Sequence, residues 1–192
     1  MKSLPNLLTI LRLLACPLLI YLFEIANYLW ILIIFVLACL TDFFDGYLAR
    51  KKNFKSNFGK ALDPIADKVL IITMSVLIIV YEEILIGLLV IPFYIIIIRE
   101  IIVSSLRFNL VDKNKSIDVS LLSKYKTFIQ MIAIGSLISF MIYHDPYVFV
   151  GYKVNYLTIF LISFVKLFVW LSAFITVITG VQHYKTYLKL KK

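Results

Sequence analysis

The stretch Asp42–Asp67, DFFDGYLARKKNFKSNFGKALDPIAD, holds four carboxylates and lies between two apolar segments. These segments are Tyr28–Leu40 before it and Val69–Val80 after it. A charged side chain in the hydrocarbon of a membrane costs about 3 kcal/mol or more, so such residues usually serve a function. The four acids therefore predict a functional site in a membrane protein.

The four acids form two pairs with helical spacing. Asp42 and Asp45 are three positions apart, and Asp63 and Asp67 are four apart, so each pair shares one face of a helix. Two such helices joined by a short turn run antiparallel and can bring all four acids together. Like charges so close cannot all ionise without cations, and hard oxygen ligands select Mg²⁺, Mn²⁺ or Ca²⁺. For Asp63, helix capping before Pro64 is an alternative role.

The fixed residues of this stretch resemble the signature of the CDP-alcohol phosphatidyltransferases. Every position of the pattern D-x2-D-G-x2-A-R-x8-G-x3-D-x3-D is filled, by Asp42, Asp45, Gly46, Ala49, Arg50, Gly59, Asp63 and Asp67. The resemblance implies a membrane enzyme that displaces CMP from CDP-diacylglycerol with an alcohol. It also implies two metal ions, Mg²⁺ or Mn²⁺, with all four acids as ligands and Asp67 as general base.

The same resemblance implies that the other signature residues contact the CDP-lipid. Gly46 and Gly59 would allow close approach of the substrate, Ala49 fits beside them, and Arg50 is a natural phosphate partner. The alternatives are helix packing for the small residues and a topology role for Arg50.

The composition predicts an all-α integral membrane protein with one domain, residues 1–192. The chain is 62% hydrophobic with a mean hydropathy of +0.96, far above a soluble domain. Each apolar segment is near the ~20 residues that cross a bilayer, which predicts six transmembrane helices. The segments are Leu7–Ile25, Tyr28–Leu48, Gly59–Tyr81, Leu85–Leu106, Tyr125–Tyr143 and Tyr156–Val181.

The basic residues predict the orientation. The net charge of +9 comes from short loops between apolar segments, which favours contact with anionic lipid and argues against nucleic acid as a partner. Lysine and arginine concentrate in Arg50–Lys60, in Arg107–Lys126 and after Val181, while the opposite loops hold Glu82, Glu83 and Lys153. The positive-inside rule then predicts a protein of the cell (inner) membrane, with both termini and the acid pairs on the cytoplasmic side.

Three polar residues interrupt the first apolar segment. Asn6, Thr9 and Arg12 recur at intervals of three. One interpretation is an interfacial first turn with Arg12 reaching the headgroups. The other is a polar face turned toward the active site, and resemblance to the family favours this one, with Asn6 and Thr9 as CDP-lipid contacts.

Basic residues further along predict a pocket for an acceptor phosphate. Arg99, next to Glu100, lies deep in an apolar segment, and Lys124 and Lys126 begin the next one. Lys124 and Lys126 do not share a helical face unless the helix starts between them. The alternative for Arg99 is a structural ion pair. These segments, with Arg107, are similar to the branch of the family that makes phosphatidylglycerophosphate from sn-glycerol 3-phosphate, although Ser123 stands where that branch would have glycine.

The sequence is compatible with several alternatives. Other acceptors within the family would make the chain a cardiolipin, phosphatidylserine or phosphatidylinositol-phosphate synthase. A divalent-cation transporter would also use intramembrane carboxylates. The family resemblance further implies a homodimer. His183, at the end of the last segment, is interpreted as a solvated or headgroup-contacting residue.

Overall fold

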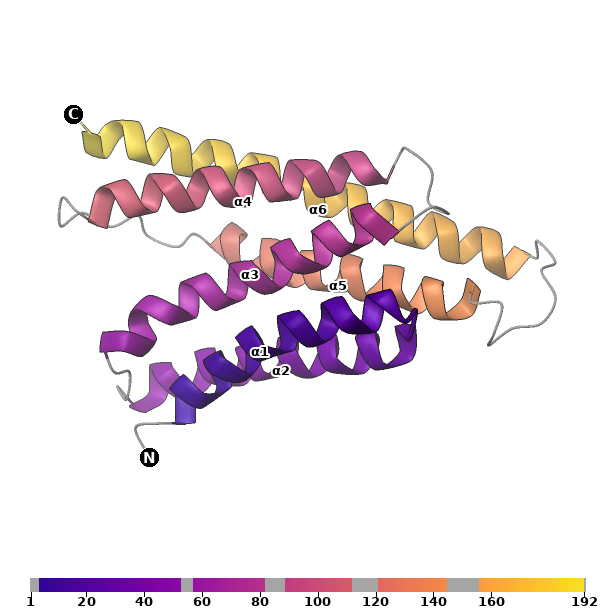
Figure 1. Cartoon of the computed structure of the whole chain (residues 1–192). Helices are drawn as coiled ribbons and strands as arrows, with labels where there is room; N and C mark the ends of the chain where they lie inside the picture. The colour runs from indigo at the N-terminus through magenta and orange to yellow at the C-terminus, as the bar shows by residue number, and fades with distance from the viewer. Residues whose placement is uncertain (1–3, 53–56, 82–88, 112–120, 145–155, 192) are drawn as a thin grey trace. The chain divides into compact units, whose positions relative to one another are not determined.

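The computed structural model describes residues 4–52, 57–81, 89–111, 121–144 and 156–191. Side chains are described for residues 10–41, 68–80, 89–106, 122–123, 125–143 and 156–190. Within these ranges the chain forms six helices and no strand, which confirms the all-α prediction (Figure 1). The helices are α1 (Leu4–Glu24), α2 (Tyr28–Lys52), α3 (Asn57–Tyr81), α4 (Val90–Val111), α5 (Leu121–His144) and α6 (Tyr156–Lys191).

The helix ends differ from the hydropathy boundaries. α2 continues through Lys52, and α3 already begins at Asn57, so the described parts of the basic segment Arg50–Lys60, residues 50–52 and 57–60, are helical. α6 extends to Lys191, ten residues past the expected end at Val181. The end of an apolar segment marks where a helix would leave an apolar environment, but a helix can continue beyond it until a helix-breaking residue occurs. Neither proline nor glycine follows Val181, so α6 can continue past it.

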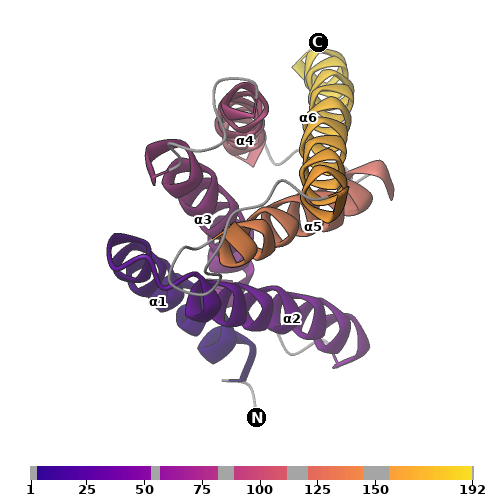
Figure 2. The ribbon, with the colours of Figure 1, turned by 90° about the vertical axis from the view of Figure 1, so that its right-hand side faces the viewer.

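A tight turn joins α1 to α2, and the two helices pack side by side (Figures 1 and 2). The amide of Asn27 donates to the Leu22 carbonyl at 3.0 Å, and that of Ala26 donates to the Phe23 carbonyl at 3.1 Å. This is the Schellman pattern, and it places Ala26 in the left-handed region with φ 51°. Asn27 then caps α2, since its Oδ1 accepts from the Trp30 amide at 3.5 Å.

The chain forms two compact units. The first contains α1, α2, most of α3 and the part of α5 from Gly135 onward. Apolar side chains from all four helices are buried within it, among them Leu19, Phe35, Met74 and Leu137. Between helices in lipid, such contacts stabilise the unit mainly through van der Waals packing. The acid pairs of the signature belong to this unit.

The second unit contains the end of α3, α4, the part of α5 up to Ile134, and α6. α4 and α6 pack along one another (Figure 1). The buried residues here include Phe93 and Ile96 of α4, Ile134 of α5 and Val169 of α6. Polar and charged side chains are buried in this unit as well, and these form the site described below.

The apolar surface of α6 is typical of a helix in lipid. Phe160, Leu167 and Phe174, seven positions apart, are 63–65% exposed along one face, while Val169 and Ala173 are buried on the other. A helix that is apolar on both its buried and its exposed faces indicates a membrane environment. Among the described residues, two helices are long and apolar enough to cross a bilayer, over Tyr125–Tyr143 and Tyr156–Leu190.

Candidate functional site

The two acid pairs lie at matching levels of two consecutive helices. Asp45 lies seven residues before the end of α2, and Asp63 lies six residues after the start of α3. Asp42 and Asp67 each lie ten residues from those same ends. With a rise of about 1.5 Å per residue, the pairs are about 10 and 15 Å along either helix. α2 and α3 run in opposite directions (Figure 1), so the acids of the two pairs lie at similar distances from the facing ends of their helices.

The side chains of these four acids lie outside the described residues, as do those of Asn6, Thr9, Gly46, Ala49, Arg50 and Gly59. The backbones of all ten residues are helical. Among the side chains that the structure does describe, no group of three or more acids, histidines or cysteines gathers as a metal site. Four carboxylates on two helices are a donor set suited to hard divalent cations. Metal binding by this set stays a prediction.

Arg12 is buried in α1. Its side chain is only 3% exposed, so the interpretation in which it reaches out to the headgroups is wrong. A buried guanidinium needs polar partners inside the protein. The burial of Arg12 therefore favours the other interpretation, in which the polar face of α1 turns inward.

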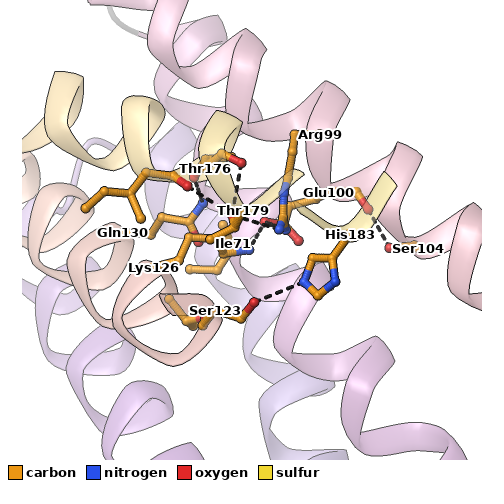
Figure 3. A network of polar contacts seen from close by, with 12 residues as sticks. Ile71, Arg99, Glu100, Ser104, Ser123, Lys126, Gln130, Thr176, Thr179 and His183 are labelled. Carbon is orange, nitrogen blue, oxygen red and sulfur yellow. Dashed lines mark hydrogen bonds and ion pairs between the residues drawn. The ribbon is translucent and has the colours of Figure 1, made fainter. Parts of the chain in front are cut away.

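A buried ion-pair cluster joins α4 to α5 (Figure 3). Oε1 of Glu100 accepts a hydrogen bond from Nη1 of Arg99 at 3.2 Å and another from Nζ of Lys126. The three residues are 9%, 3% and 6% exposed, respectively. Arg99 and Lys126, both predicted as acceptor-phosphate residues, therefore meet on one carboxylate. Their role in binding phosphate remains a prediction, and the Arg99–Glu100 pair is also the structural ion pair considered as its alternative.

The other two predicted acceptor residues are helical. Arg107 lies near the end of α4 and Lys124 near the start of α5, and neither side chain is described. α5 begins at Leu121, before both lysines. The condition under which Lys124 and Lys126 would share a helical face is therefore not met. The structure brings the ammonium group of Lys126 to Glu100.

α6 supplies polar partners that the sequence analysis missed. Nη2 of Arg99 donates to Oγ1 of Thr179 at 2.9 Å, and Nε2 of Gln130 donates to Oγ1 of Thr176 at 3.0 Å. Both threonines are fully buried. The signal was present in the sequence, because polar residues at 176, 179 and 183 have helical spacing within an otherwise apolar segment.

The expectation for His183 is wrong. His183 is only 4% exposed, and its Nε2 lies 3.0 Å from Oγ of Ser123 on α5 (Figure 3). Ser123 is the residue that departs from the glycine expected at its position. The serine hydroxyl and the imidazole therefore pair with each other, which explains both residues together.

The comparison with protein families matches nearly the whole chain. Residues 2–182 match the model of the CDP-alcohol phosphatidyltransferases. The chain belongs to this family. As a CDP-alcohol phosphatidyltransferase it is an enzyme of a membrane family that uses divalent metal ions. Membership removes the support for the divalent-cation transporter.

Curated relatives cover most of the chain. A protein of Rickettsia typhi named CDP-diacylglycerol–glycerol-3-phosphate 3-phosphatidyltransferase is 40% identical over 193 residues, covering 96% of this chain and 97% of the relative. Proteins with the same name in Wigglesworthia glossinidia brevipalpis and Bacillus subtilis are 46% and 34% identical. These two alignments cover 71% and 79% of this chain, and 76% and 70% of the relatives.

Proposed function

We propose that this enzyme transfers the phosphatidyl group of CDP-diacylglycerol to sn-glycerol 3-phosphate, giving phosphatidylglycerophosphate and CMP. The observation that carries the proposal is the full-length similarity to relatives named for this reaction. The buried Arg99–Lys126 pair supports it, because an acceptor with a phosphate needs cations that serine or a lipid hydroxyl would not need.

In the proposed reaction, the primary hydroxyl oxygen of glycerol 3-phosphate attacks the phosphorus that bears the diacylglycerol. The bond from this phosphorus to the oxygen of CMP breaks, and Asp67 takes the hydroxyl proton. When bound by Asp42, Asp45, Asp63 and Asp67, two Mg²⁺ or Mn²⁺ ions would neutralise the diphosphate and the leaving CMP. The protein's share of catalysis is then positioning and charge stabilisation.

The remaining signature residues would hold the CDP-lipid. Gly46, Ala49 and Gly59 leave room for the substrate, and Arg50 is a cation for its diphosphate. Asn6 and Thr9 lie on the same face of α1 as the buried Arg12, which supports a polar surface for the nucleotide. Arg107 and Lys124 would join Arg99 and Lys126 around the acceptor phosphate.

The proposed setting is a single catalytic domain in the cell (inner) membrane. It has six transmembrane helices, with both termini and the active site on the cytoplasmic side. The concentration of lysine and arginine at one set of helix ends supports this orientation. A homodimer is part of the proposal.

The test is an acceptor assay on the purified full-length protein. CDP-diacylglycerol and Mg²⁺ or Mn²⁺ would be supplied with labelled sn-glycerol 3-phosphate, serine, phosphatidylglycerol or inositol phosphate. The expected result is a labelled lipid and stoichiometric CMP release with glycerol 3-phosphate only. A lipid product from serine, phosphatidylglycerol or inositol phosphate, and none from glycerol 3-phosphate, would replace the proposed acceptor.

A further inference from the structure

α6 carries a polar stripe that faces α4 and α5. The stripe consists of Thr176, Thr179, Gly180 and His183, whose spacing places them on one face of the helix. The three polar side chains are buried and hydrogen-bonded to residues of the other two helices. No step of the proposed reaction uses them, so their burial calls for a separate explanation.

On the α4 side, the stripe fixes the side chain of Arg99. The Thr179 hydroxyl lies 3.0 Å from the carbonyls of Ile175 and Thr176 in its own helix, and it accepts from Arg99 at 2.9 Å. Since a hydroxyl has a single proton, donating it to a helix carbonyl turns the oxygen lone pairs toward the guanidinium. Thr179 thereby holds Nη2 of Arg99, while Glu100 holds Nη1.

Gly180 leaves the room that this arrangement needs. A Cβ at position 180 would lie 3.1 Å from Cγ and 3.5 Å from Nε of Arg99. An alanine at this position would therefore require the arginine stem to shift by a few tenths of an ångström. The close approach of α6 to Arg99 depends on glycine at this position.

On the α5 side, the stripe contacts residues on both sides of Lys126. His183 pairs with Ser123, three positions before the lysine, and Thr176 accepts from Gln130, four positions after it. Ser123, Lys126 and Gln130 share one helical face. α6 therefore fixes the segment of α5 that carries Lys126.

From these contacts we infer that α6 positions the two cations of the acceptor-phosphate site, with Thr179 and Gly180 acting on Arg99, and His183 and Thr176 acting on the α5 segment around Lys126. These are positioning residues, because they hold the cations and need not touch the substrate. Arginine and lysine side chains lose considerable rotamer freedom when an anion immobilises them, and prior fixation reduces that loss. The inference rests on the proposed use of a phosphorylated acceptor.

The test compares variants of the full-length protein in two assays. Thr179→Val removes the hydroxyl at nearly constant volume, Thr179→Ser restores it, and Gly180→Ala displaces Arg99 while keeping its partners. Ser172→Ala is the matched control, because Ser172 is a buried hydroxyl of α6 whose hydrogen bond, among the described residues, goes to the Val169 carbonyl of its own helix. The first assay measures KM for both substrates, and the second measures the thermal stabilisation of the protein by inorganic phosphate and by glycerol 3-phosphate.

For Thr179→Val and Gly180→Ala, the expected result is a KM for glycerol 3-phosphate raised about five- to tenfold, in the range of one lost hydrogen bond. In both variants, KM for CDP-diacylglycerol should stay within about twofold of the wild-type value. Thr179→Ser should restore a wild-type KM for glycerol 3-phosphate, and Ser172→Ala should have the KM values of the wild type. Both KM values rising together, or neither changing, would overturn the inference.

The binding assay separates this inference from the proposed reaction. If the wild type is stabilised by the anions and Thr179→Val is not, the positioning role holds even where no phosphatidylglycerophosphate forms. If the wild type forms that product but Thr179→Val and Gly180→Ala are stabilised as well as the wild type, the reaction stands and the positioning role falls. A wild type that neither anion stabilises would overturn the inference directly.

Discussion

Nη2 of Arg99 on α4 donates a hydrogen bond of 2.9 Å to Oγ1 of Thr179 on α6, eighty positions away. The other Nη atom of Arg99 bonds Glu100, the next residue in its own helix. A buried guanidinium is unfavourable unless such partners surround it. The bond to Thr179 therefore links α6 to the cluster of Arg99, Glu100 and Lys126. Within this cluster the two buried cations both pair with the carboxylate of Glu100.

Replacing Glu100 with glutamine should destabilise the protein strongly. Glu100 Oε1 accepts from both Arg99 and Lys126, so Glu100→Gln removes the carboxylate between two buried cations. Breaking a buried ion pair by removing one partner costs about 3–5 kcal/mol. Thermal unfolding in detergent should show a much lower Tm, while Glu24→Gln, at an exposed glutamate of α1, should leave it unchanged. Equal Tm values for both variants would contradict the role of Glu100.

Replacing Arg99 with lysine should weaken use of the acceptor. The two Nη atoms of Arg99 bind different partners, Glu100 and Thr179, and a lysine ammonium lacks the planar fork that reaches both. Arg99→Lys keeps the charge but should raise KM for glycerol 3-phosphate about tenfold, which steady-state kinetics would measure. Lys166→Arg exchanges an exposed cation of α6 and is the control, whose KM for glycerol 3-phosphate should equal that of the wild type. An unaltered KM in Arg99→Lys would show that the charge alone suffices.

Replacing Ala26 with glycine should stabilise the turn between α1 and α2. Ala26 has φ 51°, a conformation that glycine adopts without the steric penalty of a Cβ. Ala26→Gly should add about 0.5–1 kcal/mol to the free energy of unfolding, measured as a higher Tm. Ala15→Gly, within α1, should have the opposite sign because glycine weakens a helix interior. A lower Tm for Ala26→Gly would contradict the strain assigned to Ala26.

Replacing Asp67 with asparagine should separate proton transfer from metal binding. General-base catalysis contributes about 10²–10⁴-fold, so Asp67→Asn should lower kcat for CMP release by about a hundredfold or more. Excess Mn²⁺ should partly restore Asp42→Asn, whose proposed role is ligation alone, and should not restore Asp67→Asn. Equal restoration of both variants by Mn²⁺ would remove the base role from Asp67.

Much of the architecture follows from local sequence. Apolar length and the acid spacing predict the order of the helices and the level of the acid pairs, because both depend on the rise and period of one helix. The residues at which the helices end are harder to predict from the sequence. The turn at Ala26 lacks the glycine that usually marks a Schellman motif. The last turns of α6, after Val181, lack the run of apolar residues from which hydropathy would predict a helix.

Contacts between distant segments could not be predicted in the same way. Glu100 pairs with Lys126 and Arg99 with Thr179 only because three helices pack together, and no local period encodes such pairing. The hydropathy of the last helix predicts that it faces lipid, and the apolar side chains on the exposed face of α6 support this prediction. The buried stripe around Thr179 and His183 is visible once helical spacing is applied to the polar residues of that helix.

The most direct measurement of the central claim is a Mn²⁺ titration of the purified full-length protein, followed by electron paramagnetic resonance in the presence of CDP-diacylglycerol. If the level pairs on α2 and α3 form the metal site, the wild type should bind two Mn²⁺ ions per chain. A variant combining Asp45→Asn and Asp63→Asn, one acid from each helix, should lose this binding while retaining the wild-type helical content. Mn²⁺ binding of equal stoichiometry and affinity in the variant would contradict the claim.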